Sequence, residues 1–233
     1  MTDLPNTSIS LRVLARLLSY PDAALRDDLP DMRAALRVDR ALSASRKDEL
    51  YALIATLESG DVLDHEAQYV ELFDRGRATS LHLFEHVHGD SRERGAAMVD
   101  LLQTYETAGL LLSPGELPDF LPALLEFAST QPPAQSRSLL GEMAHLINAI
   151  FNALQQRRSA YASVLGALLE LAGESTHAQS VAPDQALDAA WEEPVAFAGC
   201  ASPGQAKAGS AVQTIHFVKA PAATTCASTG VSQ

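Results

Sequence analysis

Residues 8–21 read SISLRVLARLLSYP, and this stretch predicts the fold class of the chain. Its apolar side chains recur at the three- and four-residue spacing of one α-helix face, and Pro21 ends the run. Similar amphipathic segments follow as far as Ala172, separated by turn-forming residues. This part of the chain lacks convincing strand patterns. We therefore predict an all-α fold, a single bundle of roughly eight to ten helices.

Cap residues predict where several of these helices begin. Asp22 is suited to cap a short second helix, and a third is predicted over about residues 45–58. Asp64 is suited to cap a fourth helix, a short helix is predicted over 81–87, and a further helix is predicted over 119–129. An Asp side chain at such a start can accept hydrogen bonds from the unpaired N–H groups of the first turn.

The composition changes near Gly173, where strong helix formers give way to Ser, Thr, Ala, Gly, Pro and Gln. Such a segment buries too little apolar surface to offset the entropy cost of ordering it. We therefore divide the chain into a helical domain at 1–172 and a low-complexity, mostly disordered tail at 173–233. The tail contains Cys200 and Cys226, which make neither a disulfide framework nor a closed zinc site.

The chain carries 17 Lys and Arg residues against 29 Asp and Glu residues, a formal net charge of −12. An acidic surface repels nucleic acid and anionic bilayers, so neutral or basic partners are favoured. No apolar run approaches the roughly 18 residues of a membrane span. The start, MTDLPNTSIS, lacks the features of a secretory signal. We therefore expect a soluble cytoplasmic protein without nucleic-acid partners or membrane insertion.

Residues 69–94, YVELFDRGRATSLHLFEHVHGDSRER, contain the densest group of ionisable side chains. On a helix His82 and His86 share one face, with Glu85 adjacent and His88 two residues on, a spacing that could supply ligands to a divalent metal. A metallopeptidase needs Glu directly after the first His, and this sequence has Leu there. Hydrogen bonding of these side chains to the nearby glycine loops is the structural alternative, and pH sensing is a third.

Four arginines flank the same stretch. They are Arg75, Arg77, Arg92 and Arg94. Guanidinium groups at this density can bind a phosphate or carboxylate bidentately, although no glycine-rich phosphate loop is present. Nearby Asp and Glu residues can equally pair with them, so the sequence allows an anion site or internal ion pairs.

Residues 115–127, GELPDFLPALLEF, form a second group. Pro118 disfavours helix at the residue before it, so Glu116 and Asp119 are predicted to lie on an exposed corner. The apolar residues beside this corner include Leu117 and Phe120. Acidic groups at the lip of an apolar groove suit a peptide that carries basic residues beside a hydrophobic helical stretch. The alternative is that Asp119 only caps the following helix.

Catalytic patterns are missing from the sequence. It has no serine nucleophile elbow, no cysteine in 1–172, and no glycine-rich dinucleotide loop after a strand. Carboxylate pairs are plentiful but lack a distinguishing context. We therefore predict that the chain is not an enzyme.

Together these stretches resemble the NarJ-type nitrate reductase assembly chaperones, of the TorD/DmsD superfamily of redox enzyme maturation proteins. The resemblance rests on YVELFDRGR from Tyr69, SLHLFEHVHGDSRERG from Ser80 and ELPDFLP from Glu116, and it spans about residues 9–172. It implies an all-helical chaperone that binds the N-terminal segment of the catalytic (alpha) subunit of nitrate reductase. Such chaperones hold this client until its molybdenum cofactor is inserted, and they restrain early membrane attachment.

The resemblance also implies the residues that bind the client. In the superfamily the Tyr-x-x-Leu-Phe run and the Glu-x-Pro-Asp corner are associated with recognition of the client peptide. With the apolar neighbours of the corner, the predicted client-binding residues are Tyr69, Leu72, Phe73, Glu116, Leu117, Pro118, Asp119 and Phe120. Many relatives carry His where this chain has Phe120, and the aromatic side chain of Phe120 would still pack against an apolar peptide.

No cofactor is expected to bind the chaperone stably, and molybdenum cofactor biosynthesis proteins are further candidate partners. Two other classes of function stay open at the level of sequence. One is a metal-binding protein or metal-dependent enzyme built on the histidine cluster. The other is a helical adaptor for another molybdoenzyme.

Overall fold

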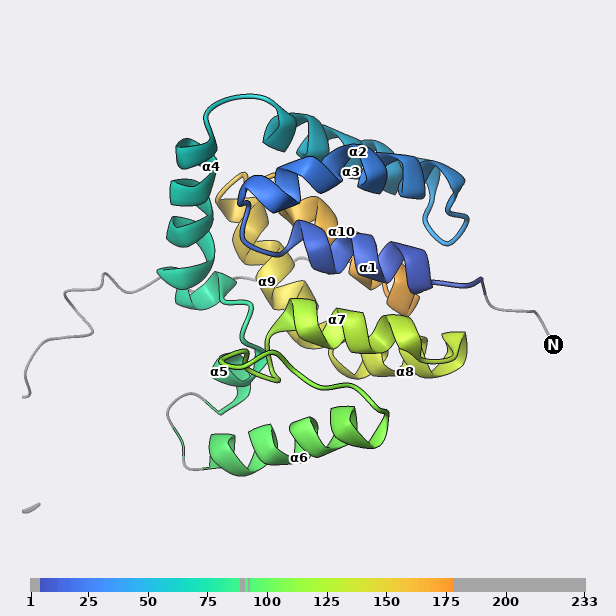
Figure 1. The fold of residues 1–233 in the computed structure, drawn as a ribbon, viewed down its shortest axis with the longest axis vertical. Helices are drawn as coiled ribbons and strands as arrows, with labels where there is room; N and C mark the ends of the chain where they lie inside the picture. Colours follow the sequence, from blue (N-terminus) through green and yellow to red (C-terminus); the bar gives the residue numbers. More distant parts are fainter. Residues whose placement is uncertain (1–4, 89–90, 92, 178–233) are drawn as a thin grey trace, which may run out of the picture. The chain divides into compact units, whose positions relative to one another are not determined.

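The computed structural model of the protein describes residues 5–88, 91 and 93–177. These residues form ten α-helices, a π-helical segment and a 3-10 turn, with no β-strand among them (Figure 1). The helices confirm the predicted all-α fold. In chain order they are α1 (Ser8–Leu17), α2 (Ala23–Val38), α3 (Ala44–Glu58), α4 (Val62–Tyr69), the π-helical η1 (Val70–Asp74), the 3-10 η2 (Arg77–Thr79), α5 (Leu83–Val87), α6 (Glu93–Thr107), α7 (Leu121–Thr130), α8 (Pro133–Glu142), α9 (Ala144–Gln156) and α10 (Ala162–Ala172).

Two helices form the centre of the bundle, α1 and α10. α1 packs against α2, α7 and α10, while α10 also packs against α3, α8 and α9. Because α10 is apolar around most of its circumference, it is buried on nearly every side, and Val164, Leu165 and Leu168 are fully shielded. Figure 1 shows α1 across the middle of the bundle, with α2 above it and α7 below it.

The start of α2 matches the sequence prediction, whereas its length does not. The Asp22 carboxylate accepts a hydrogen bond from the Leu25 N–H at 2.8 Å and caps the helix as predicted. The helix predicted to be short instead continues through Pro30 to Val38. Pro30 removes one backbone hydrogen bond. The buried apolar stripe that extends to Leu36 outweighs this loss.

One predicted cap is wrong, and so is one cap that the sequence offered as an alternative. α4 begins after Asp61 rather than Asp64, because the Asp61 carboxylate accepts a hydrogen bond from the Leu63 N–H at 2.8 Å. α7 begins after Phe120, which makes no side-chain cap, so Asp119 does not cap this helix. In both places the sequence offers more than one acceptable start, and the path of the preceding loop selects between them.

Aromatic side chains attach η1 to the core. The Tyr69 ring centroid lies 4.8 Å from that of Phe73 and 6.1 Å from that of Tyr161. The Tyr69 hydroxyl donates a hydrogen bond to the Leu18 carbonyl at 2.7 Å, which ties the end of α4 to the end of α1. Tyr69 and Phe73 are each 4 % exposed. Both rings therefore belong to the core of the bundle.

The described chain continues for a few residues past α10. Gly173 follows α10 with φ of 81°, in the left-handed region that favours glycine. The Asn148 side chain on α9 accepts a hydrogen bond from the His177 N–H at 3.0 Å and donates one to the His177 carbonyl at 2.9 Å. The rest of the predicted tail, with Cys200 and Cys226, lies outside the described residues.

No helix in the described ranges combines the length and the hydropathy of a transmembrane span.

We expect Tyr69→Phe to lower the free energy of unfolding by about 1–2 kcal/mol, because it removes the buried hydrogen bond to Leu18. Urea denaturation followed by circular dichroism measures this change. The control is Tyr51→Phe, which keeps the ring beneath Arg33 and should change stability by less than about 0.5 kcal/mol. Equal effects of the two substitutions would contradict the prediction.

Candidate functional site

Two stretches that the sequence singles out meet in space at the start of α5. A short antiparallel bridge pairs His82 with Phe120. The Leu83 N–H donates to the Asp119 carbonyl at 3.0 Å, and a second backbone hydrogen bond of 2.9 Å closes the other side of the bridge. The bridge places residues 81 and 82 outside the helix, so α5 begins two residues later than predicted.

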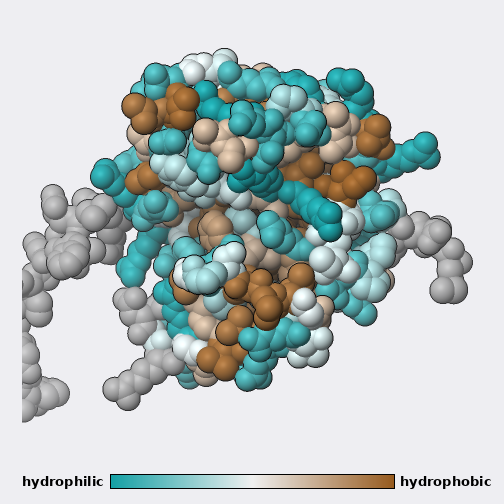
Figure 2. All heavy atoms as spheres, viewed as in Figure 1, coloured by the Kyte–Doolittle hydropathy of each residue, from teal (hydrophilic) through white to brown (hydrophobic). Residues whose placement is uncertain are grey.

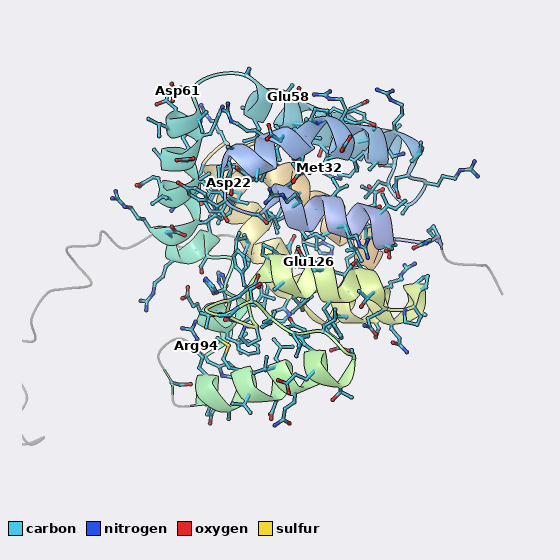
Figure 3. All side chains as sticks on the ribbon, in the orientation of Figure 1. Asp22, Met32, Glu58, Asp61, Arg94 and Glu126 are labelled. Carbon is cyan, nitrogen blue, oxygen red and sulfur yellow. The ribbon has the colours of Figure 1, made fainter. Side chains whose placement is uncertain are left out.

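The carboxylate of Asp119 is fully buried at this junction. One of its oxygens accepts a hydrogen bond from the Phe84 N–H at 3.1 Å, so Asp119 caps α5 from a distant part of the chain. The same oxygen lies 3.7 Å from Arg94 Nη2, and the other lies 3.4 Å from His82 Nδ1. One buried charge therefore connects α5, α6 and the loop before α7, and Figure 3 shows Arg94 beside α5.

Glu85 and Ser80 extend this network. Arg94 Nη2 lies 3.5 Å from one Glu85 oxygen, and the Ser80 hydroxyl donates to the other at 2.6 Å. His86 Nε2 lies 2.9 Å from the Ser80 carbonyl oxygen. Glu85 and His86 thus hold the loop that leads into α5.

The hydrogen bond with Asp119 raises the pKa of His82 above its ordinary value. The negative charges of Asp119 and Glu85 add to this shift, whereas burial and the positive charge of Arg94 oppose it. The His82 ring also packs on Phe120, with centroids 5.2 Å apart. Protonation of His82 is therefore coupled to the contacts that hold the junction together.

The exposed corner predicted around Pro118 is only partly present. Glu116 and Leu117 are exposed, whereas Pro118 and Asp119 are buried. The prediction that Asp119 lies on an exposed corner is therefore wrong. The physical reason is that the backbone of Asp119 forms the bridge to α5, which turns its carboxylate inward towards Phe84 and Arg94.

A groove of about 400 Å³ opens beside Glu116, between α1, α7 and the loop that follows α6. Its charged lining residues are Arg12, Glu116 and Glu126. Its apolar lining includes residues 110–112, Ala123 and Phe127. Figure 2 shows apolar side chains gathered on this face at the level of the loop between α6 and α7, and Figure 3 shows Glu126 on α7. The groove therefore combines an apolar floor with a mainly acidic rim.

Tyr105 fixes the loop that forms one wall of this groove. Its hydroxyl donates a hydrogen bond to the Pro118 carbonyl at 2.8 Å, and its ring centroid lies 4.9 Å from that of Phe127 on α7. Because Tyr105 lies in α6 and is only 1 % exposed, it joins α6, the loop and α7 in one packed unit.

The Tyr-x-x-Leu-Phe residues do not reach this groove. Tyr69 and Phe73 are buried in the aromatic core, which contradicts direct contact with a peptide at the surface. Leu72 lines a different groove, which shares no lining residue with the first. The structure therefore brings Glu116, Leu117 and Phe120 to one region and places the Tyr69–Phe73 run elsewhere.

The histidine cluster does not assemble as a metal centre in the described part of the chain. No three His, Cys, Asp or Glu side chains among the described residues converge as metal ligands. The His88 ring packs instead on Phe84, with centroids 5.5 Å apart. His82 and His86 are engaged with Asp119 and Ser80, as described above.

The four flanking arginines have different surroundings. Arg75 pairs with Glu71 at 3.2 Å on the surface, whereas Arg94 pairs inward with Glu85 and Asp119. Arg77 lies exposed in η2, and Arg92 lies outside the described residues. Arg75 and Arg94 therefore form internal ion pairs, which is one of the two arrangements that the sequence allowed for these arginines.

Sequence reasoning missed Arg12, Glu126 and residues 110–112 as lining of the groove. The three leucines at 110–112 carried a signal, because a loop between Gly109 and Pro114 offers no helix face on which to bury all of them. Arg12 and Glu126 had no such signal, since they come from distant helices that only the packing of α1 on α7 brings together.

Comparison with known proteins shows clear similarities. The family described as nitrate reductase delta subunit matches residues 39–167. The nitrate reductase molybdenum cofactor assembly chaperone NarJ of Escherichia coli (strain K12) is 45 % identical over 195 residues, which cover 79 % of this chain and 83 % of the relative. NarW of the same strain, assigned the same role, is 41 % identical over 193 residues, 78 % of this chain and 80 % of the relative.

A solved structure shares the fold. It is a protein from Archaeoglobus fulgidus assigned as a redox enzyme maturation protein, with a TM-score of 0.52 and 19 % identity, covering 72 % of this chain and 94 % of that one. At this identity the likeness concerns the fold alone. The curated relatives are named as assembly chaperones rather than catalysts, which confirms the prediction of a non-enzyme, and the molybdenum cofactor in their names is that of nitrate reductase.

We expect Asp119→Asn to lower the free energy of unfolding by about 3 kcal/mol, because it leaves the partly buried Arg94 and His82 without their shared counter-charge. Urea denaturation of both proteins measures the difference. Glu116→Gln, at an exposed position, is the control and should change stability by less than about 0.5 kcal/mol. A loss no larger than that of the control would contradict the assigned role.

The raised pKa of His82 predicts how stability depends on pH. A group whose folded pKa lies above its unfolded value of about 6.5 stabilises the fold fully below that value, and the contribution is lost as pH rises through the folded pKa. The free-energy advantage of the native chain over His82→Gln should therefore shrink as the pH rises above about 6.5. Urea denaturation across this range tests it, and a constant or growing advantage would refute it.

Proposed function

The chain belongs to the nitrate reductase delta subunit family, and on that premise we propose that it is an assembly chaperone of nitrate reductase. In this proposal it binds the N-terminal segment of the catalytic (alpha) subunit and holds it until the molybdenum cofactor is inserted. Occupying that segment would also delay attachment of the client to the membrane. We place this activity in the cytoplasm, as the sequence predicts.

The groove beside Glu116 is the observation that carries the proposal. A client N-terminus that folds as an amphipathic helix would lay its apolar face on residues 110–112 and Phe127. Its Lys or Arg residues would meet Glu116 and Glu126 at the rim. Each buried leucine-sized side chain contributes about 1.5–3 kcal/mol before the cost of ordering the peptide. A few such contacts approach the roughly 8 kcal/mol that micromolar affinity requires.

The predicted client-binding residues take different parts in this proposal. Glu116, Leu117 and the half-buried Phe120 are accessible to a client. Asp119 and Pro118 would act by holding the corner in place, since both are buried. Tyr69 and Phe73 would act only as part of the core that supports the bundle.

Calorimetric titration of the full chain with a synthetic peptide of the alpha-subunit N-terminus tests the proposal. A scrambled peptide of equal charge is the control. Saturable binding of the true sequence alone supports a client-specific chaperone. Equal binding of both peptides, or of neither while the protein is shown to be folded, would contradict it, and leader peptides of other molybdoenzymes test whether the client is a different one.

We expect the double substitution Glu116→Gln and Glu126→Gln to weaken this binding by about 2–30-fold, because each of the two rim pairs with a client cation contributes about 0.2–1 kcal/mol. The salt dependence of binding should flatten as well, since fewer charges are screened. Asp31→Asn with Glu142→Gln removes the same charge at exposed positions on α2 and α8 and is the matched control. If both double variants bind alike, Glu116 and Glu126 do not contact the client.

A further inference from the structure

The second groove has a volume of about 420 Å³ and lies between α3, the α4–η1 segment and the turn from α9 to α10. Its apolar part is formed by Leu53, Leu57 and Leu72. At its rim, Glu71 is already paired with Arg75 at 3.2 Å, and Arg157 has a partner of its own, while Arg158 brings a further positive charge. In a chain with a net charge of −12 this is a locally basic groove.

Arg158 occupies a backbone position that suits glycine. It follows the end of α9 with φ of 53°, and among the described residues it alone has a positive φ without being glycine. The Ser159 N–H donates a hydrogen bond to the Leu154 carbonyl at 3.0 Å, which closes the end of α9. Helices that end with this hydrogen bond commonly have glycine at the position that Arg158 occupies here. Because an arginine is strained there, the side chain rather than the backbone accounts for its presence.

Two hydrogen-bond donors in this groove lack an acceptor within the described ranges. The exposed guanidinium of Arg158 lines the groove and has no hydrogen-bond or ion-pair partner among the described residues. Tyr161 lines the same groove and is 6 % exposed. Its hydroxyl is buried, and no described residue accepts a hydrogen bond from it. The Tyr161 hydroxyl is shielded from solvent, so the donor that an occupant of the groove can reach is the guanidinium of Arg158.

The geometry points to a second binding site, one that takes a protein segment in which carboxylate side chains flank a large apolar residue. A carboxylate at the rim would accept hydrogen bonds from Arg158. The apolar residue would cover the three leucines. The client helix proposed for the first groove has the opposite charge, so this inference does not depend on that proposal.

The probe for this site is the capped tripeptide acetyl-Glu-Trp-Glu-amide, titrated into the full chain labelled with ¹⁵N. Nuclear magnetic resonance would follow the backbone amides of residues 157–161. We expect their shifts to saturate with this probe. The charge-reversed acetyl-Lys-Trp-Lys-amide and the small acetyl-Glu-Ala-Glu-amide should leave them nearly unchanged, since each lacks one of the two required features.

Substitutions at Arg158 test the assignment without disturbing the core. Arg158→Gly should weaken binding of the glutamate probe by about tenfold, because it removes one charge-assisted hydrogen bond. The same substitution should leave the thermal midpoint equal or higher, because glycine relieves the strain at this φ. Arg158→Lys should retain most of the binding. Arg40→Gly, which removes an exposed arginine from another loop, is the matched control and should change neither property.

Several outcomes would overturn the proposal. The groove does not select carboxylates if the amide shifts fail to saturate with the glutamate probe. The same conclusion follows if the lysine peptide causes equal shifts, or if the shifts persist unchanged in Arg158→Gly. A dimer that forms with rising protein concentration and is abolished by Arg158→Gly would show that a second copy of the chain occupies the groove instead.

Discussion

The buried carboxylate of Asp119 is the contact on which this side of the bundle depends. It accepts from the backbone of α5, lies against His82, and faces Arg94 from α6. A charge removed from water must be neutralised where it lies, because no solvent can replace a lost partner. The loop before α7, α5 and the start of α6 are therefore positioned together. The shape of the groove beside Glu116 follows from that arrangement.

The bundle presents two grooves of similar volume and different charge. The first, between α1, α7 and the loop after α6, carries two carboxylates and one arginine, whereas the second carries an adjacent pair of arginines and one carboxylate that is already paired. Electrostatic complementarity selects partners more than it strengthens binding. The occupants proposed for the two grooves therefore differ in charge, as the grooves themselves do.

The motifs that reveal the family mostly build the scaffold. The family match and the NarJ relatives confirm the resemblance drawn from Tyr69–Arg77, the histidine run and the Pro118 corner. In the structure Tyr69 and Phe73 fill the core, and Asp119, His82 and Glu85 form one buried or half-buried network. The groove itself is lined largely by residues outside those motifs, such as Arg12 and Phe127. A motif can therefore identify a family without locating its binding surface.

The sequence by itself determined the helical class, most helix positions and the family. These properties depend on local spacing and on short strings, which a single chain displays directly. It could not determine that Asp119 turns inward, that Arg12 and Glu126 share a groove, or that Arg158 adopts a left-handed conformation beside Tyr161. Those features arise where segments distant in sequence pack together. Side-chain direction and burial at such contacts are set by the neighbouring helices, so only the tertiary structure decided them.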